Sequence, residues 1–430
     1  MASANPYLNF YRWPFRLPSP LVLIAFFLAI LVTLPLLYVL FSAVVADTAI
    51  WRRLWTTRIP ELLVNTSSLA IGVAIIDLVL GVSLAWIITR YRFPGSAVWD
   101  WLIVLPLAIP SYVLAYTYTY LLQRHGPLEQ VWQTIAGPDA QIFSPFSFAG
   151  AVLVMSLNTF PFVYLLARSA LKNFNVSFEE AARATGASRL STFFRVSLPM
   201  IRPSLIAGLF LAILYVVSDF GAVSMLRFQT FTYAIYQQMT GRFDNAAAAC
   251  LSLLLVGSTF LFLLGERWFR QRSRFYQTTG RFRKPVPQAC SSLQTVCFSG
   301  YLVFIVVAAF GFPVLLLVQW TLAALSAGDI SSMFFGYLWN SLSLAAVTAT
   351  LAIFVGIPLA FLACRKQTWT SLLCIQGAYT GYVLPGPVAA LAVLVLVSQL
   401  IPELYGTVVV LLIAYMVHFL PVALQGMEST

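Results

Sequence analysis

The stretch SFEEAARATGASRLSTFFRVSLP, residues 177–199, is charged and rich in small residues, whereas the sequence on either side of it is apolar. Ser177 followed three residues later by Glu180 predicts a helix N-terminus closed by a capping box. Gly186 suits the left-handed backbone that ends such a helix, and a second short helix is expected to follow and to be broken at Pro199. Two short helices that meet at a glycine predict a docking element for another protein.

The composition excludes a soluble globular chain. Of the 430 residues, 60% are hydrophobic and only 9% are charged, and several apolar stretches reach the roughly 20 residues that a helix needs to cross a bilayer. These stretches are continuously apolar rather than alternating, which disfavours a β-barrel. We therefore predict an all-α polytopic membrane protein. Its ten expected spans lie near residues 20–45, 63–88, 98–121, 147–170, 200–224, 246–266, 293–320, 338–363, 371–399 and 405–425.

The basic residues predict the orientation of the chain. With a cytoplasmic N-terminus, most of the 25 lysines and arginines fall in the inner loops, as the positive-inside rule requires. The net charge of +11 then reflects orientation and contact with anionic lipid, and no basic soluble module points to nucleic acid. The first apolar stretch is too long for a signal peptide, so we expect it to be retained as a span. The remaining six basic residues fall in the outer loops: Arg52, Arg53, Arg58, Arg124, Arg227 and Arg242.

An internal repeat relates two apolar stretches, residues 63–90 and 339–366, each of which ends on basic residues. At a constant offset of 275 residues, polar and small residues match as well as the leucines and alanines that any two membrane helices share. Matches of Asn, Gly and Arg at fixed spacing indicate two copies of one membrane unit. These matches are Asn65 with Asn340, Gly81 with Gly356, and Arg90 with Arg365.

The motif Glu180-Ala181-Ala182, with Gly186 after it and Leu198-Pro199 at the end, resembles the cytoplasmic EAA signature of binding-protein-dependent ABC importer permeases. The one departure is Val196, where the pattern has isoleucine. In that family the segment forms the coupling helices that dock on the ATP-hydrolysing subunit. The resemblance implies the same role for residues 176–199, hereafter the coupling segment. It places these residues at the contact: Glu179, Glu180, Ala181, Ala182, Gly186, Leu198 and Pro199.

Further motifs resemble the two-repeat permeases of ferric-iron importers, with thiamine permeases as the next relatives. They include SDFGAV at 218–223, TFTYAIY at 230–236 and ERWFR at 266–270. The resemblance implies a type-I ABC importer permease of the bacterial inner membrane, which moves ferric iron, thiamine or another small solute delivered by a periplasmic binding protein. It also implies that ATP and Mg²⁺ bind to a separate ABC ATPase dimer, while this chain binds no cofactor or resident metal.

The repeat also predicts the domain organisation. The second copy stops short of a second coupling segment, because the counterpart of Glu180 would fall beyond Thr430; we expect a truncated chain, a split chain or a fragment. The expected domains are 1–62, with a tail, the first span and an outer loop; 63–266, the first transmembrane repeat with the coupling segment; 267–292, a basic cytoplasmic linker; and 293–430, the second repeat.

Few polar side chains interrupt the apolar stretches. Asp77 and Asp219 are unfavourable in lipid, so each is expected to face the transport pathway or to hydrogen-bond a neighbouring helix. Asn65 and Asn340 are expected to form interhelical hydrogen bonds. A membrane-embedded enzyme is the alternative from another class, but it would need catalytic groups clustered at one depth, which these sparse residues disfavour. The sequence carries no phosphate-cradling loop for ATP hydrolysis.

Overall fold

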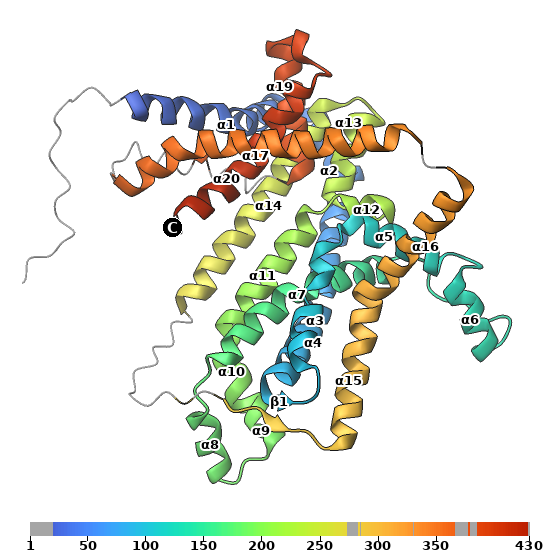
Figure 1. The fold of residues 1–430 in the computed structure, drawn as a ribbon. Helices are drawn as coiled ribbons and strands as arrows, with labels where there is room; N and C mark the ends of the chain where they lie inside the picture. The colour runs from blue at the N-terminus through green and yellow to red at the C-terminus, as the bar shows by residue number, and fades with distance from the viewer. Residues whose placement is uncertain are drawn as a thin grey trace, which may run out of the picture. The chain divides into compact units, whose positions relative to one another are not determined.

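The computed structural model is almost entirely helical (Figure 1). Contacts between Cα atoms divide the chain into two compact units, and each is described here by itself. The larger unit comprises residues 39–337 and 383–391, and the smaller unit comprises residues 1–38, 338–382 and 392–430. The structure describes residues 20–272, 283, 285–329, 331–365, 377–378 and 385–428.

The larger unit contains the coupling segment and the helices that hold it. Short 3₁₀ or π turns, at Leu105–Ala108, Phe193–Ser197 and Val307–Gly311, connect some of its helices. In chain order these helices are α2 (Thr48–Thr57), α3 (Ile59–Arg90), α4 (Ser96–Leu102), α5 (Ser111–Leu122), α6 (Pro127–Ala136), α7 (Phe148–Lys172), α8 (Ser177–Ala184), α9 (Arg189–Thr192), α10 (Leu198–Met200), α11 (Arg202–Ser218), α12 (Gly221–Met225), α13 (Phe231–Thr240), α14 (Asn245–Arg272), α15 (Ser292–Val306) and α16 (Phe312–Ala327).

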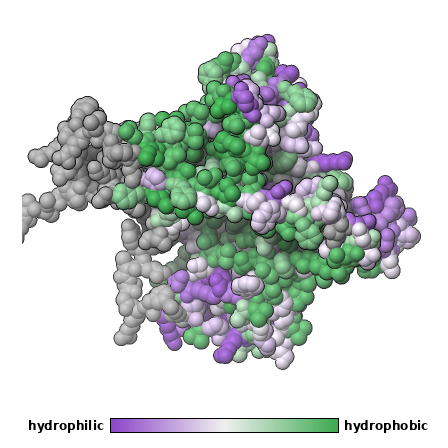
Figure 2. All heavy atoms as spheres, turned by 45° about the horizontal axis from the view of Figure 1, so that its top comes forward, coloured by the Kyte–Doolittle hydropathy of each residue, from purple (hydrophilic) through white to green (hydrophobic). Residues whose placement is uncertain are grey.

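Six helices of the described residues are long and apolar enough to cross a membrane, and the number rises to eight if each of two bent helix pairs counts as one span. Two shorter apolar helices follow near the C-terminus, Gly386–Leu400 and Val408–Leu424. Hydrophobic side chains cover much of the face shown in Figure 2, as expected of helices that face lipid. The predicted all-α polytopic fold is therefore confirmed. The stretch expected at 371–399 lies partly outside the described residues.

The span predicted at 98–121 is bent rather than straight, which corrects the sequence prediction. The helical sections before and after Ile109-Pro110 meet at 93°. Ile109 has an extended backbone, the conformation that a proline imposes on the residue before it. Asn158 of α7 donates hydrogen bonds to the carbonyl oxygens of Pro106 and Ile109, at 3.2 and 3.0 Å. These bonds give partners to carbonyls at the interruption of the helix, where lipid offers none.

Helices α3, α7 and α11 form the packed centre of the larger unit. A Cβ added to Gly81 of α3 would lie 2.7 Å from the Cβ of Val163 and 2.8 Å from the backbone nitrogen of Tyr164. A Cβ added to Gly208 of α11 would lie 2.9 Å from the Cα of Val163. Small residues let helix backbones approach closely in a membrane. Two glycines from different helices therefore fix the position of the same turn of α7.

A two-residue parallel pair attaches the linker to the end of α3. Strand β1 (Tyr91–Arg92) follows α3 directly and pairs with β2 (Gln288–Ala289). The backbone N–H of Cys290 extends the pairing by donating to the carbonyl of Arg92 at 3.3 Å. Much of the linker predicted at 267–292 lies outside the described residues, but its C-terminal end is held beside the coupling segment.

The smaller unit contains the helix that corresponds to α3 under the repeat offset. It comprises all of α20 (Val408–Glu428) and most of α1 (Pro20–Val45), α17 (Met333–Arg365) and α19 (Gly386–Leu400), with a 3₁₀ turn at Pro402–Leu404. The bounds of α3 shifted by 275 fall within one residue of those of α17. Gly356, the counterpart of Gly81, also lies at a helix contact, since an added Cβ would be 2.9 Å from Cε of Met427 in α20. Thr430 lies outside the described residues.

The close approach of α3 to α7 predicts that Gly81→Ala destabilises the protein. The added methyl group meets the α7 backbone, which must move, so the expected loss is about 1–3 kcal/mol. It is measured as a lower melting temperature in detergent. Gly257→Ala in α14 is the matched control, because nothing lies within 4 Å of its added Cβ and alanine favours helix. Equal melting temperatures for the two variants would contradict this packing.

Candidate functional site

The coupling segment folds as two short helices joined at a glycine, as the sequence predicted. Helix α8 ends just before Gly186, whose φ is +90°. Glycine adopts this left-handed backbone without the strain that a Cβ would cause. Helix α9 begins after Ser188, whose Oγ accepts a hydrogen bond from the backbone N–H of Ser191 at 3.2 Å and so caps the helix. The turn between the helices therefore depends on the glycine and on a serine cap.

The predicted capping box between Ser177 and Glu180 is wrong. Helix α8 follows Val176, which provides no side-chain cap. The N–H of Val176 donates instead to the carbonyl of Arg283 at 3.1 Å. The guanidinium of Arg283 lies 3.2 Å from both carboxylate oxygens of Glu180. A charge-assisted contact of this kind is stronger than a bond to a neutral backbone amide, so the carboxylate of Glu180 points to the linker rather than back to the start of its own helix.

The second helix does not end at Pro199, which corrects another prediction. After α9, residues Phe193–Ser197 form a π-helical turn in which the N–H of Leu198 donates to the carbonyl of Phe193. Pro199 then lies in the first turn of α10, where its missing N–H needs no partner. The chain bends only at Ile201, where the sections before and after it meet at 68°. The span predicted at 200–224 is therefore bent at its start.

Glu179 anchors the coupling segment to the end of α3. Its Oε1 lies 2.6 Å from a guanidinium nitrogen of Arg90 and accepts a hydrogen bond from Ser197 Oγ at 2.7 Å. Both charged side chains are largely buried, with 14% of Glu179 and 10% of Arg90 exposed. The guanidinium of Arg90 also stacks over the rings of Trp86 and Phe174. One carboxylate thus connects α8, the π-helical turn and α3.

The opposite face of the coupling segment is open. Ala181 and Gly186 are exposed, and Ala182 is half-buried. Phe178 is a large apolar side chain that remains exposed, at 42%. Leu198 and Pro199, which were predicted to join the contact, are half-buried in the turn before α11. Small and apolar exposed residues around a fixed turn are suited to contact with another protein.

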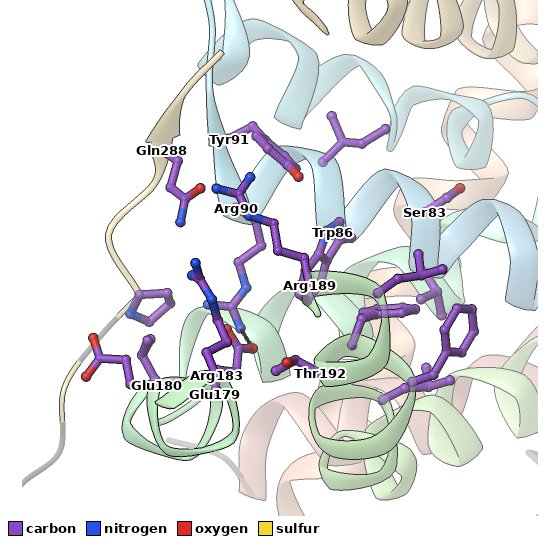
Figure 3. Close-up of a pocket in the computed structure, with 18 of the residues that line it drawn as sticks. Ser83, Trp86, Arg90, Tyr91, Glu179, Glu180, Arg183, Arg189, Thr192 and Gln288 are labelled. Atoms are coloured by element: carbon purple, nitrogen blue, oxygen red, sulfur yellow. Dashed lines mark hydrogen bonds and ion pairs between the residues drawn. The ribbon is translucent and has the colours of Figure 1, made fainter. Parts of the chain in front are cut away.

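A pocket of about 690 Å³ lies on the side of the coupling segment that faces α3. Its walls come from the second half of α3, from α8, α9 and the π-helical turn, and from the end of the linker. Figure 3 shows Glu179 and Thr192 on the helices of the coupling segment, with Trp86 and Ser83 on α3 across from them. The pocket therefore lies between the coupling segment and α3, beside the contacts of Glu179 with Arg90 and of Phe193 with Trp86.

Two of the predicted polar residues connect α3 to other segments by hydrogen bonds; the partner of Asp77 lies on a helix, whereas the partner of Asn65 lies in the loop before α13. The side-chain amide of Asn65 donates to the carbonyl of Gln229 at 3.1 Å. Asp77 is completely buried and accepts a hydrogen bond from Thr159 of α7 at 2.7 Å. The other carboxylate oxygen of Asp77 has no partner among the described residues. Asn65 and Asp77 therefore connect α3 at two points along its length, to the loop before α13 and to α7.

Of the other two predicted polar residues, Asp219 hydrogen-bonds a neighbouring helix, as expected, and Asn340 lies in the smaller unit. Asp219 caps the short helix α12 by accepting a hydrogen bond from the N–H of Ala222 at 2.8 Å, and it also accepts one from Ser111 Oγ of α5. Asn340 is exposed on α17 in the smaller unit. In the described part of the chain, no group of three or more His, Cys, Asp or Glu side chains is placed to hold a metal ion. These residues do not gather into one polar site.

Sequence reasoning did not identify the partners that hold the coupling segment. Arg90 was noted only as a matched residue of the repeat, and Arg283 only as part of a basic linker. The π-helical turn that brings Ser197 to Glu179 has no sequence signature. The one available signal was the match of Arg90 with Arg365, since a charge repeated at the end of two apolar helices suggests a fixed partner.

Known transport permeases are similar to this chain in sequence. The family of binding-protein-dependent transport system inner membrane components matches residues 77–275. The Fe(3+)-transport system permease protein FbpB 2 of Haemophilus influenzae is 31% identical over 422 residues, which cover 97% of this chain and 79% of that protein. The molybdenum transport system permease protein ModB of Escherichia coli is 32% identical over 216 residues, or 49% of this chain and 91% of that protein.

The ion pair predicts that the two adjacent glutamates differ in their effect on stability. Glu179→Gln leaves the Arg90 guanidinium buried without a counter-charge, so we expect a loss of about 3 kcal/mol. Glu180→Gln breaks only an exposed pair with Arg283, so we expect a change below about 1 kcal/mol. Melting temperatures of the purified variants in one detergent test this difference. A Glu180 variant that is as unstable as the Glu179 variant would contradict the anchoring role of Glu179.

Proposed function

The chain belongs to the family of binding-protein-dependent transport system inner membrane components, and from this premise we propose that it imports ferric iron. The observation that supports ferric iron as the substrate is the similarity to a ferric-iron permease over 97% of the chain. The Ferric transport system permease protein FbpB of Actinobacillus pleuropneumoniae also aligns over 94% of it, at 24% identity. The chain is thus an importer permease with many spans, in a family of bacterial inner membranes. Thiamine or another small solute is the alternative substrate, and the membrane-embedded enzyme is not supported.

The coupling segment is the proposed contact with an ABC ATPase dimer. It presents small and apolar residues on an open face, including Ala181 and Gly186. Its opposite side is attached to α3 by Glu179. A force applied to the open face would therefore reach a membrane helix through the buried ion pair and the ring contact of Phe193 with Trp86. In the proposed cycle, ATP and Mg²⁺ bind to the ATPase, and closure of the dimer moves the coupling segment and rocks the membrane helices.

The domain organisation is proposed to be two related membrane units, with a cytoplasmic N-terminus. The ModB subunit, almost in full, aligns with about half of the chain, which suits a chain with two copies of one unit. Gly81 of α3 and Gly356 of α17, which match in the repeat, each lie at a contact with another helix. A periplasmic binding protein would deliver the substrate at the opposite side of the membrane from the coupling segment.

The docking role predicts that Gly186→Pro abolishes association with the ATPase. Proline cannot adopt a φ of +90°, so the turn between α8 and α9 must change. Gly137→Pro is the matched control, because Gly137 also has a positive φ and open space around its Cβ but lies between α6 and α7. Co-purification of a tagged ATPase from membranes measures the contact. Equal recovery of the ATPase with both variants would rule out docking at the coupling segment.

The proposed substrate predicts uptake of radiolabelled ferric iron. Cells that produce the chain with its ATPase and binding protein are expected to accumulate iron, and excess unlabelled thiamine should not compete. Glu180→Lys, which places a cation against Arg283, should reduce uptake without loss of the chain from the membrane. Accumulation of thiamine in place of iron would overturn the substrate and leave the importer class intact.

A further inference from the structure

The pocket behind the coupling segment has two chemically different ends. Arg90, Arg183 and Arg189 gather on one side of it, away from Ser83 (Figure 3). The remaining walls carry the apolar side chains of α3 and of the π-helical turn, including Val79 and Phe194. A volume of about 690 Å³ lies within the range of about 300–1,000 Å³ that is usual for sites of small molecules.

The basic end carries excess positive charge. Glu179 and Glu180 are the acidic residues of the lining, and each is already paired, with Arg90 and Arg283 respectively. Arg183 and Arg189 have no ion-pair partner among the described residues, and both are exposed at the pocket. Two guanidinium groups are therefore left to bind an anion.

The buried guanidinium of Arg90 adds an independent observation. Arg90 is 9% exposed, and one of its terminal nitrogens contacts Glu179. Its Nε is buried without a hydrogen-bond partner among the described residues. A buried donor without a partner is unfavourable. The Arg90 guanidinium therefore forms part of the basic wall of the pocket, whereas its enclosed Nε is not a contact for a ligand.

The apolar end extends along a membrane helix. The lining follows α3 from Arg90 back to Leu78, a distance of about 18 Å at 1.5 Å per residue. This length is comparable to one leaflet of a hydrocarbon core about 30 Å thick. Val79 is 62% exposed and Phe194 is 56% exposed, so this part of the groove opens to the surroundings rather than closing over a soluble ligand.

We propose that an anionic phospholipid occupies this pocket, with its phosphate between Arg183 and Arg189 and one acyl chain along α3. Basic pockets beside membrane helices on the cytoplasmic side suit such headgroups, and the apolar groove matches an acyl chain. The lipid would lie between the coupling segment and α3, beside the Glu179–Arg90 ion pair. This site is on the inner side of the segment, away from Ala181 and Gly186, and it does not depend on which solute is imported.

The test is a lipid titration of the purified chain in detergent. Dioleoyl-phosphatidylglycerol should raise the melting temperature in a saturable way, and dioleoyl-phosphatidylcholine, which has the same acyl chains, should raise it less. The double variant R183Q/R189Q should need at least about ten times more phosphatidylglycerol for half of the shift, since each surface arginine contributes about 1 kcal/mol to binding of anionic lipid. Free glycerol phosphate should produce no shift.

The matched control is the double variant R195Q/R202Q. It removes the same charge from exposed arginines close in the sequence that do not line the pocket, and it should titrate as the unmodified chain does. If both double variants, or neither, lost the response to phosphatidylglycerol, the proposed site would be overturned in favour of general charge attraction. Equal shifts with the two lipids would overturn the anionic headgroup, and a full shift with glycerol phosphate would overturn the acyl chain.

Discussion

The buried ion pair between Glu179 and Arg90 is the interaction on which the candidate site depends. It joins a short charged helix to the end of a 32-residue membrane helix, and Ser197 adds the π-helical turn to the same carboxylate. A buried pair is weak proof of net stability, but loss of one partner is strongly destabilising. The pair therefore fixes the position of the coupling segment, and its geometry leaves Ala181 and Gly186 on the open side.

The membrane helices supply a rigid body for this attachment. Gly81 and Gly208 bring α3 and α11 against Val163 of α7 at backbone distance, and Asp77 hydrogen-bonds Thr159 in the same region. Close backbone packing and a buried polar contact resist sliding of one helix past another. Movement imposed on the coupling segment would then be transmitted by α3 as a unit rather than absorbed by local bending.

The sequence predicted the features that depend on composition and local backbone chemistry. Apolar length gave the spans, and Gly186 gave the left-handed turn. The sequence alone could not predict features that depend on partners distant in the chain: Glu180 pairs with Arg283 instead of capping its helix, and Asn158 of α7 gives the carbonyl of Ile109 a partner at the bend. The motif singled out Glu180, whereas the buried anchor is Glu179, because burial is decided by the position of α3.

Site-specific photo-cross-linking tests the central claim most directly, that the coupling segment is anchored on its inner side and contacts the ATPase through its open face. Benzoylphenylalanine at Ala181 should cross-link to the ATPase in membranes when the complex is assembled. The same photo-reactive residue at Ile135, which is exposed on α6, should not. Cross-linking from Ile135 and none from Ala181 would contradict the account.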